Sequence, residues 1–200
     1  MPVRLLLVIV IAFAFGSLAA FALRHGDPGQ QIMKAQIGGP FALTDHEGKR
    51  VTDQDFRGKL MLVTFGYTSC PDVCPAELQT IANALDALGA KADEVTPIFI
   101  TVDPERDTAQ QMGEYVKNFH KRFVGLTGTP EEIKQAARAY RVYYAKAEAK
   151  DSALGYLMDH SAFIYLMNRQ GEYVTHFSYS TPSEKIASTV EKAIASGGSS

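Results

Sequence analysis

The 200-residue sequence has no concentration of charge of one sign. Its 20 Lys and Arg residues are balanced by 22 Asp and Glu residues, and no Lys/Arg-rich run appears. Such a chain has no electrostatic field that would gather phosphates, so nucleic acid is a poor candidate partner. The sequence also has no internal repeat. With 46% hydrophobic and 21% charged residues, it has the composition of one compact domain plus an appendage.

The appendage is the N-terminus, where residues 5–23 carry no charge between Arg4 and Arg24. A helix of that length spans about 28 Å, close to the hydrocarbon thickness of a bilayer. We therefore expect a signal anchor, a transmembrane segment, over residues 1–24. The small-residue stretch Ala20-Phe21-Ala22 leaves open a cleaved signal peptide and a soluble form, and the C-terminal part is exported in both cases. Residues 25–39 are expected to be a linker, residues 40–196 the folded domain and residues 197–200 a flexible tail.

Hydrophobic periodicity predicts strands that alternate with helices. Apolar runs indicate strands at 60–65, 96–102 and 142–147, and hairpins that pair 41–43 with 49–52 and 161–167 with 172–177. Apolar spacings of three and four residues, together with N-terminal helix signals, indicate helices at 75–88, 108–120, 130–140 and 182–195. This order predicts an α/β fold with a central mixed sheet flanked by helices. A cysteine motif after the first buried strand makes the predicted fold thioredoxin-like, with an N-terminal β-hairpin.

The sequence has only two cysteines, Cys70 and Cys74. In an exported protein such a pair is either a disulfide or a working site, and a disulfide across so short a loop would stabilise little. If a helix begins at Pro71 with Cys70 as its N-cap, both sulfurs lie on one side of its first turn, where the helix terminus lowers thiol pKa values. Residues four apart on a helix have Cβ atoms about 5 to 6 Å apart, against about 3.8 Å in a disulfide. The spacing therefore favours a soft metal over disulfide exchange.

A third metal ligand is predicted at His160. Two thiolates suit Cu(I), and a site that also holds Cu(II) requires an imidazole. His160 precedes the strand at 161–167, and in a thioredoxin-like fold the segment that enters this strand lies against the cysteine loop. Two neighbours keep alternative roles: Asp159 either orients the ring or belongs to an ordinary turn, and Met158 is either an axial thioether or, by preference, an apolar contact.

Other polar residues compete less well for the site. Asp103 leaves the second buried strand on the same edge of the sheet as Cys70, so it either approaches the site or caps the turn before the next helix. His25, His120 and His176 are expected to be solvated side chains.

At these residues the chain closely resembles the Sco/SenC family. The matching stretches are Phe65-Gly-Tyr-Thr-Ser-Cys-Pro-Asp-Val-Cys-Pro75, Val102-Asp-Pro-Glu-Arg-Asp-Thr108 and Asp159-His160. The resemblance runs from about residue 39 to residue 194. It implies a thioredoxin-like copper-binding protein with a single membrane anchor, which helps assemble the binuclear copper (CuA) centre of cytochrome c oxidase. Carried over by position, the copper ligands are Cys70, Cys74 and His160.

The resemblance also implies partners and a location. The partners are the copper-site subunit of the oxidase, the inner membrane and either another copper chaperone or a thioredoxin-like reductant. No Arg-rich amphipathic transit peptide precedes the apolar segment, which favours a bacterial periplasm over a mitochondrion. We therefore expect a domain in the periplasm, anchored to the bacterial inner membrane or released by cleavage.

The sequence is compatible with two functions. A metallochaperone would hold copper through Cys70, Cys74 and His160. A thiol-disulfide oxidoreductase would attack with Cys70 and resolve with Cys74, and His160 would be dispensable. We favour the chaperone, which is a binding protein rather than an enzyme. A zinc site with the same ligands lacks an obvious general base, and a peroxidase lacks a nearby Arg.

Overall fold

The computed structural model describes residues 37–148 and 155–197. The predicted anchor, the predicted linker up to residue 36 and residues 198–200 lie outside this part of the chain. Within the described residues, no helix combines the length and the apolar character needed to cross a membrane.

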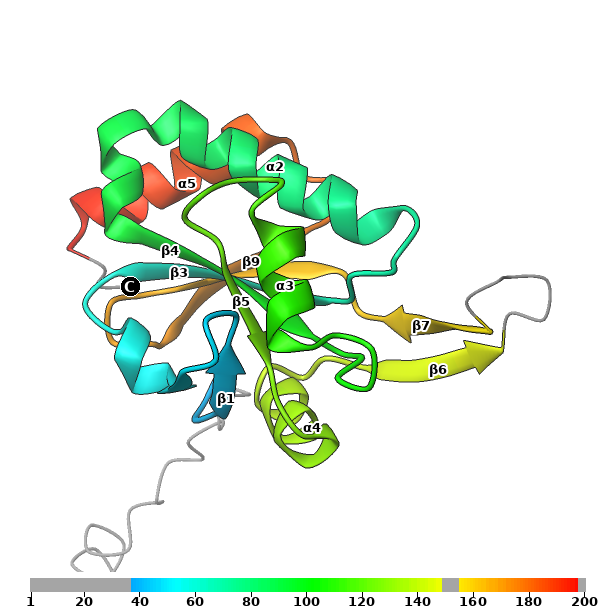
Figure 1. Cartoon of the computed structure of the whole chain (residues 1–200). Coiled ribbons are helices and arrows are strands. Elements are labelled where there is room, and N and C mark those ends of the chain that lie inside the picture. Colours follow the sequence, from blue (N-terminus) through cyan, green and yellow to red (C-terminus); the bar gives the residue numbers. More distant parts are fainter. Residues whose placement is uncertain (1–36, 149–154, 198–200) are drawn as a thin grey trace, which may run out of the picture. The chain divides into compact units, whose positions relative to one another are not determined.

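A seven-stranded mixed sheet forms the centre of the domain, in the order β2-β1-β5-β4-β3-β8-β9 (Figure 1). The strands are β1 (Ala42–Asp45), β2 (Arg50–Thr52), β3 (Leu60–Gly66), β4 (Val95–Thr101), β5 (Val124–Thr127), β8 (Phe163–Met167) and β9 (Tyr173–Ser178). β3, β4 and β5 are parallel, whereas β1 runs antiparallel to β5 and β8 runs antiparallel to β3. Because β8 opposes β3, with Tyr165 beside Val63, the chain enters β8 next to the end of β3.

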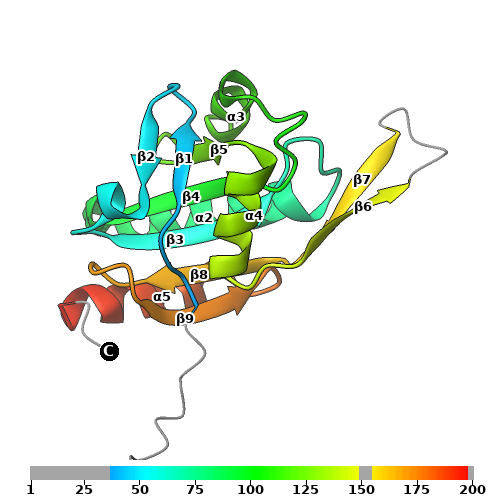
Figure 2. The same ribbon diagram turned by 90° about the horizontal axis from the view of Figure 1, so that it is seen from below.

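Helices cover both faces of the sheet (Figures 1 and 2). α2 (Val73–Leu88), α3 (Ala109–Val116) and α5 (Ser183–Ala195) lie on one face, and α4 (Pro130–Ala139) lies on the other. Each face of the sheet has its own hydrophobic core. Successive residues of a strand point to opposite faces, so Leu62 packs in the core beneath α2, α3 and α5, and Val63 packs in the core beneath α4. Every residue of β3 is buried, as expected for a strand covered on both sides. The predicted mixed sheet with helices on both faces is confirmed.

A separate two-stranded sheet carries the segment before β8. β6 (Tyr144–Glu148) pairs with β7 (Tyr156–His160), and Tyr144 lies opposite His160. Figures 1 and 2 both show this hairpin projecting away from the central sheet. The sequence indicated one strand near β6 but not its partner β7, whose polar and apolar residues gave no clear signal.

Other differences from the predicted elements are local. The two predicted hairpins are present as β1–β2 and β8–β9. β5 was not predicted, because it has only four residues and one of them is Gly125. The helix predicted at 108–120 is shorter, since Thr108 is the N-cap of α3 and the helix ends at Val116. Two short 3-10 helices, η1 (Asp53–Phe56) and η2 (Gly89–Glu94), complete the described elements.

Candidate metal centre

Three potential metal ligands meet at the carboxyl edge of β3. Among residues 37–148 and 155–197, Cys70, Cys74 and His160 form the one group of three His, Cys, Asp or Glu side chains placed closely enough to hold a metal ion. Their ligand atoms all lie within 4.8 Å of one another. The two cysteines follow β3. The histidine is the last residue of β7 and lies just before β8, which runs antiparallel to β3. The structure therefore brings together the three residues that the sequence singled out.

The cysteine loop differs in detail from the predicted helix start. α2 begins at Val73 with Asp72 as its N-cap, so Pro71 is not its first residue and Cys70 is not its N-cap. The backbone of Asp72 (φ −143°, ψ −75°) is far from helical and delays the helix by two residues. The Sγ atom of Cys70 nevertheless accepts a hydrogen bond from the backbone N–H of Cys74, at 3.4 Å. The first thiol thus contacts the amino end of α2, as the sequence argument required.

The imidazole of His160 is held in one orientation. Its Nδ1 atom lies 3.1 Å from the carbonyl oxygen of Ser161, which can only accept a hydrogen bond, so Nδ1 carries a proton. Its Nε2 atom lies 3.3 Å from Sγ of Cys74. The imidazole and the ring of Tyr67 pack edge to face, with the ring centroids 6.0 Å apart. In the neutral ring the free lone pair is therefore on Nε2, the nitrogen that faces the thiols.

The two thiols have different environments. Cys70 is half-buried and Cys74 is fully buried, and neither forms a disulfide. A hydrogen bond from the thiol of Cys74 lowers the pKa of Cys70, and the same bond together with burial raises the pKa of Cys74. Burial alone would lower the pKa of His160, but hydrogen bonds to Cys70 and to the Ser161 carbonyl raise it. In the metal-free site the negative charge therefore resides on the more exposed sulfur.

A glycine at the end of β3 makes room for the buried thiol. A Cβ atom on Gly66 would lie 2.7 Å from Sγ of Cys74 and 2.8 Å from Cε2 of Phe99. Both distances are shorter than real Cβ contacts. The backbone of β3 can approach α2 at this point only because residue 66 has no side chain.

A buried carboxyl group lies one turn beyond Cys74 and was missed by the sequence analysis. Glu77 has no exposed surface, and its Oε2 accepts a hydrogen bond from Oγ1 of Thr64 at 2.5 Å. Its Oε1 has no hydrogen-bond partner among the residues that the structure describes. Burial raises the pKa of Glu77 to about 7. Its position, three residues after Cys74 and one before the buried Leu78, was a helical-face signal for burial that went unused.

The weaker candidates do not join the ligand group. The carboxylate of Asp103 is buried and binds Arg106 and the hydroxyl of Tyr156 instead. Asp159 is exposed and adjoins His160 in a strand, so the two side chains point to opposite faces. Met158 is buried in the core on the α4 face of the sheet, which agrees with an apolar contact.

Of the other histidines that the sequence analysis weighed, His120 and His176 are not part of the group either. His176 is exposed, as predicted, and its ring contacts Phe163. His120 is half-buried rather than solvated, because its Nδ1 accepts a hydrogen bond from the backbone of Arg122. His25 lies outside the described residues.

The fold and the site together define a thioredoxin-like domain with a Cys-Cys-His group at the carboxyl edge of its sheet. The family model described as SCO1/SenC matches residues 29–195 of the sequence. The chain therefore belongs to the SCO1/SenC family.

Related proteins and solved structures agree with this assignment. The chain is 48% identical over 167 residues to the mitochondrial SCO1 homolog 1 of Arabidopsis thaliana, covering 83% of this chain and 49% of that protein. It is 39% identical over 194 residues to the human mitochondrial SCO1 homolog, covering 91% of this chain and 64% of that protein. The match thus spans about half to two thirds of the length of these relatives.

Two copper-bound structures have the same fold. The crystal structure of Arabidopsis ScoI with copper bound has a TM-score of 0.76 and 48% identity, covering 80% of this chain and 99% of that one. The structure of Bradyrhizobium japonicum ScoI with copper bound has a TM-score of 0.72 and 48% identity, covering 78% of this chain and 98% of that one. The predicted thioredoxin-like fold of this family is confirmed.

The first prediction concerns the space at Gly66. Gly66→Ala forces the new Cβ against the Cys74 sulfur and the Phe99 ring, so we expect the free energy of unfolding to fall by about 1 to 3 kcal/mol. Gly113→Ala in α3 is the control, because the nearest atom to its Cβ, on His46, is 3.4 Å away and alanine favours a helix. Denaturant unfolding of both variants measures the difference. Equal stability of Gly66→Ala and the wild type would show that the site has spare room.

The second prediction concerns the pH dependence caused by Glu77. Its pKa rises from 4.5 in the unfolded chain to about 7 in the fold, so over this interval the folded state holds a proton that the unfolded state has lost. The free energy of unfolding of the wild type therefore decreases as the pH rises from about 4.5 to about 7. Glu77→Gln keeps an oxygen for Thr64 but cannot ionise, so its stability relative to the wild type should increase by about 1 to 3 kcal/mol between about pH 5 and pH 8.

Denaturant titrations of the reduced, metal-free protein at both pH values test this prediction. Glu47→Gln, which removes an exposed carboxyl group in the β1–β2 turn, is the control. Parallel stability profiles of Glu77→Gln and the wild type would contradict a raised pKa at residue 77.

Proposed function

We propose that this chain is a copper metallochaperone that binds one copper ion through Cys70, Cys74 and His160. The observation that carries the proposal is the convergence of two sulfurs and one imidazole nitrogen within 4.8 Å of one another. Ligands bound to a metal at about 2.0 to 2.3 Å lie at most about 4.6 Å apart, so movements of less than about 1 Å bring all three atoms into reach of one ion. Little reorganisation is needed to load the site.

The donor set and its exposure suit copper transfer. Thiolates are soft ligands that favour Cu(I), and the imidazole extends the site to Cu(II). Cys74 is buried whereas Cys70 is half-exposed, which leaves one ligand open to exchange with an acceptor. Copper-bound relatives at 48% identity support the choice of metal.

The family resemblance supports an acceptor and a location. We infer that the acceptor is the copper-site subunit of cytochrome c oxidase, in which the CuA centre is assembled. Another copper chaperone or a thioredoxin-like reductant serves the same site by supplying copper or restoring the thiols. Residues 1–24 anchor the chain in the bacterial inner membrane, residues 25–39 form a linker, and residues 40–196 form the copper-binding domain in the periplasm, with a tail at 197–200. Cleavage of the anchor would leave a soluble periplasmic form.

Copper titration of the reduced full-length chain tests the ligand set. We expect one Cu(I) per chain, and at least about a tenfold weaker affinity for His160→Ala and for Cys74→Ser, because each variant removes a ligand. His120→Ala is the control: its ring lies beside Asp86 near the far end of α2 and should leave the affinity unchanged. Wild-type affinity in both ligand variants would rule out this site.

A second candidate function is thiol-disulfide exchange with the acceptor. It is favoured by the half-exposed Cys70, whose pKa is lowered, next to the buried Cys74. The Cys70 thiolate would attack a disulfide sulfur of the acceptor and release one thiolate. Cys74 would then attack Cys70, release the second acceptor thiolate and leave a Cys70–Cys74 disulfide, so the acceptor gains the two electrons that the pair loses.

Trapping of a mixed disulfide tests the second function. With a disulfide-bonded peptide as the substrate, Cys74→Ser should accumulate a mixed disulfide at Cys70, because the resolving thiol is missing. Cys70→Ser should accumulate none, and His160→Ala should still complete the exchange. Mass spectrometry of the quenched reaction identifies each species. Absence of the Cys70 adduct in Cys74→Ser would leave copper binding as the only function of the pair.

A further inference from the structure

A short segment between β4 and α3, residues 103–107, contacts both the cysteine loop and β7, the strand that ends at His160. The carboxylate of Asp107 is buried and accepts hydrogen bonds from the backbone N–H of Thr68 at 3.0 Å and from its hydroxyl at 2.6 Å. It also accepts a hydrogen bond from the hydroxyl of Thr101 at 2.6 Å. Since Thr68 stands two residues before Cys70, Asp107 ties the cysteine loop to the end of β4.

The adjacent residue, Arg106, contacts the strand that carries the histidine. Its Nη1 donates a hydrogen bond to the carbonyl oxygen of Tyr156 at 3.2 Å, and its guanidinium carbon lies 3.8 Å from the centroid of the Tyr156 ring. Its Nε is paired with the buried carboxylate of Asp103, which also accepts a hydrogen bond from the Tyr156 hydroxyl at 2.9 Å. Tyr156 is the first residue of β7 and His160 is the last.

Arg106 also lies over the ring that packs against the histidine. Its guanidinium carbon is 5.8 Å from the centroid of Tyr67, and the Tyr67 ring meets His160 edge to face. The guanidinium therefore sits between Tyr156 at the start of β7 and Tyr67 beside its end. A planar cation that stacks and donates in a fixed fork suits this place, and the compact ammonium of a lysine does not reproduce it.

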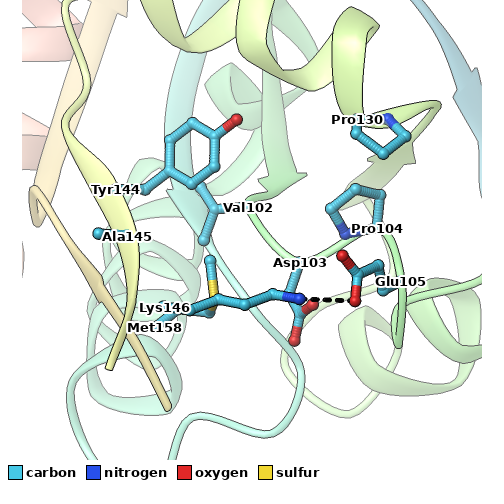
Figure 3. Close-up of a pocket in the computed structure, with 9 residues that line it drawn as sticks. All are labelled: Val102, Asp103, Pro104, Glu105, Pro130, Tyr144, Ala145, Lys146 and Met158. Atoms are coloured by element: carbon cyan, nitrogen blue, oxygen red, sulfur yellow. Dashed lines mark hydrogen bonds and ion pairs between the residues drawn. The ribbon is translucent and has the colours of Figure 1, made fainter. Parts of the chain in front are cut away.

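The β6–β7 hairpin needs such an anchor. Its described strands pair only with each other and not with the central sheet, and a two-stranded hairpin alone is marginally stable in water. Figure 3 shows the pocket between the hairpin and the segment after β4, where Lys146 pairs with Glu105 at 2.6 Å. Both of these side chains are about half exposed, so their ion pair contributes little. The partly buried hydrogen bonds from Arg106 and from Tyr156 to the buried carboxylate of Asp103 and to the β7 backbone are the stronger link.

We propose that Arg106 is a positioning residue for His160, and that residues 103–107 hold the cysteine loop and the histidine in fixed positions relative to each other. Asp107 fixes the cysteine loop, and Arg106 with Asp103 fixes the strand that ends at His160. The inference rests on the proposed copper site but adds residues that do not touch the metal. It predicts that loss of Arg106 acts through His160, whereas loss of Asp107 acts through the cysteines.

Copper affinity measured in two backgrounds tests this inference. In the full-length wild-type background, Arg106→Met should weaken copper binding about tenfold, as residues that orient a ligand do. In the His160→Ala background, Arg106→Met should cause no further loss, because the ligand that it positions is gone. Asp107→Asn should weaken binding in both backgrounds. Arg50→Met, which breaks an exposed ion pair with Glu132, should change neither affinity.

Amide hydrogen exchange of the metal-free protein provides a readout that does not depend on copper. Arg106→Met should speed exchange in β6 and β7 and leave β3 and β4 unchanged, and Arg106→Lys should restore little of the protection. Unchanged exchange in the hairpin, or an equal loss of affinity in the wild-type and His160→Ala backgrounds, would overturn the inference. Faster hairpin exchange in a chain that binds no copper would instead refute the proposed function and leave the positioning role of Arg106 intact.

Discussion

The antiparallel pairing of β8 with β3 is the constraint on which the candidate site depends. Cys74 and His160 are 86 residues apart, and neither local spacing nor a single element can bring them together. Because β3 ends at the same edge of the sheet at which β8 begins, the residues after β3 and those before β8 must meet. The parallel neighbour β4 ends at that edge as well, which delivers the segment 103–107 to the same place. The carboxyl ends of parallel strands are common ligand sites for this reason.

Bringing a sulfur into a close-packed interior has consequences for its neighbours. The Cys74 sulfur fits between β3 and α2 because Gly66 has no side chain. The helix face that buries this sulfur also buries Glu77. The hydrogen bond to Cys70 and burial raise the pKa of Cys74, and burial raises the pKa of Glu77 to about 7. In the metal-free site Cys74 therefore keeps its proton, and the negative charge is on Cys70, whose pKa is lowered by the hydrogen bond from Cys74. Metal binding requires deprotonated thiols, and so it is coupled to proton release from the deepest residue of the group.

The sequence was informative where the determining interactions are local. The uninterrupted apolar run of β3, the apolar spacing along α2 and the cysteine pair between them are short-range patterns, and they led to the correct architecture and to Cys70 and Cys74. His160 followed only from the place that a thioredoxin-like fold gives to the segment before β8. The start of α2 was misplaced because Pro71 suits a first helical position, whereas the backbone of Asp72, with φ −143° and ψ −75°, is not helical and the helix begins only at Val73. β7 was missed because a short strand of mixed polarity is stabilised by tertiary contacts that no local pattern records. The helical spacing around Glu77 indicated burial, but its hydrogen-bond partner Thr64 lies 13 residues away on β3, beyond the reach of a local pattern.

The two proposed functions draw on one asymmetry of the thiol pair. In either proposal an acceptor would meet Cys70 first, because Cys74 is buried and lies against Gly66 and the imidazole of His160. In the proposed copper transfer, the half-buried Cys70 thiolate would be the ligand that an acceptor replaces, while Cys74 and His160 would hold the ion until the exchange is complete. In disulfide exchange, the same thiolate is the nucleophile and the buried thiol is the resolving group. What separates the functions is the histidine, which only a metal requires. The partly buried contacts that hold the β6–β7 hairpin to the segment after β4 are therefore better explained by a metal centre than by a thiol pair acting alone.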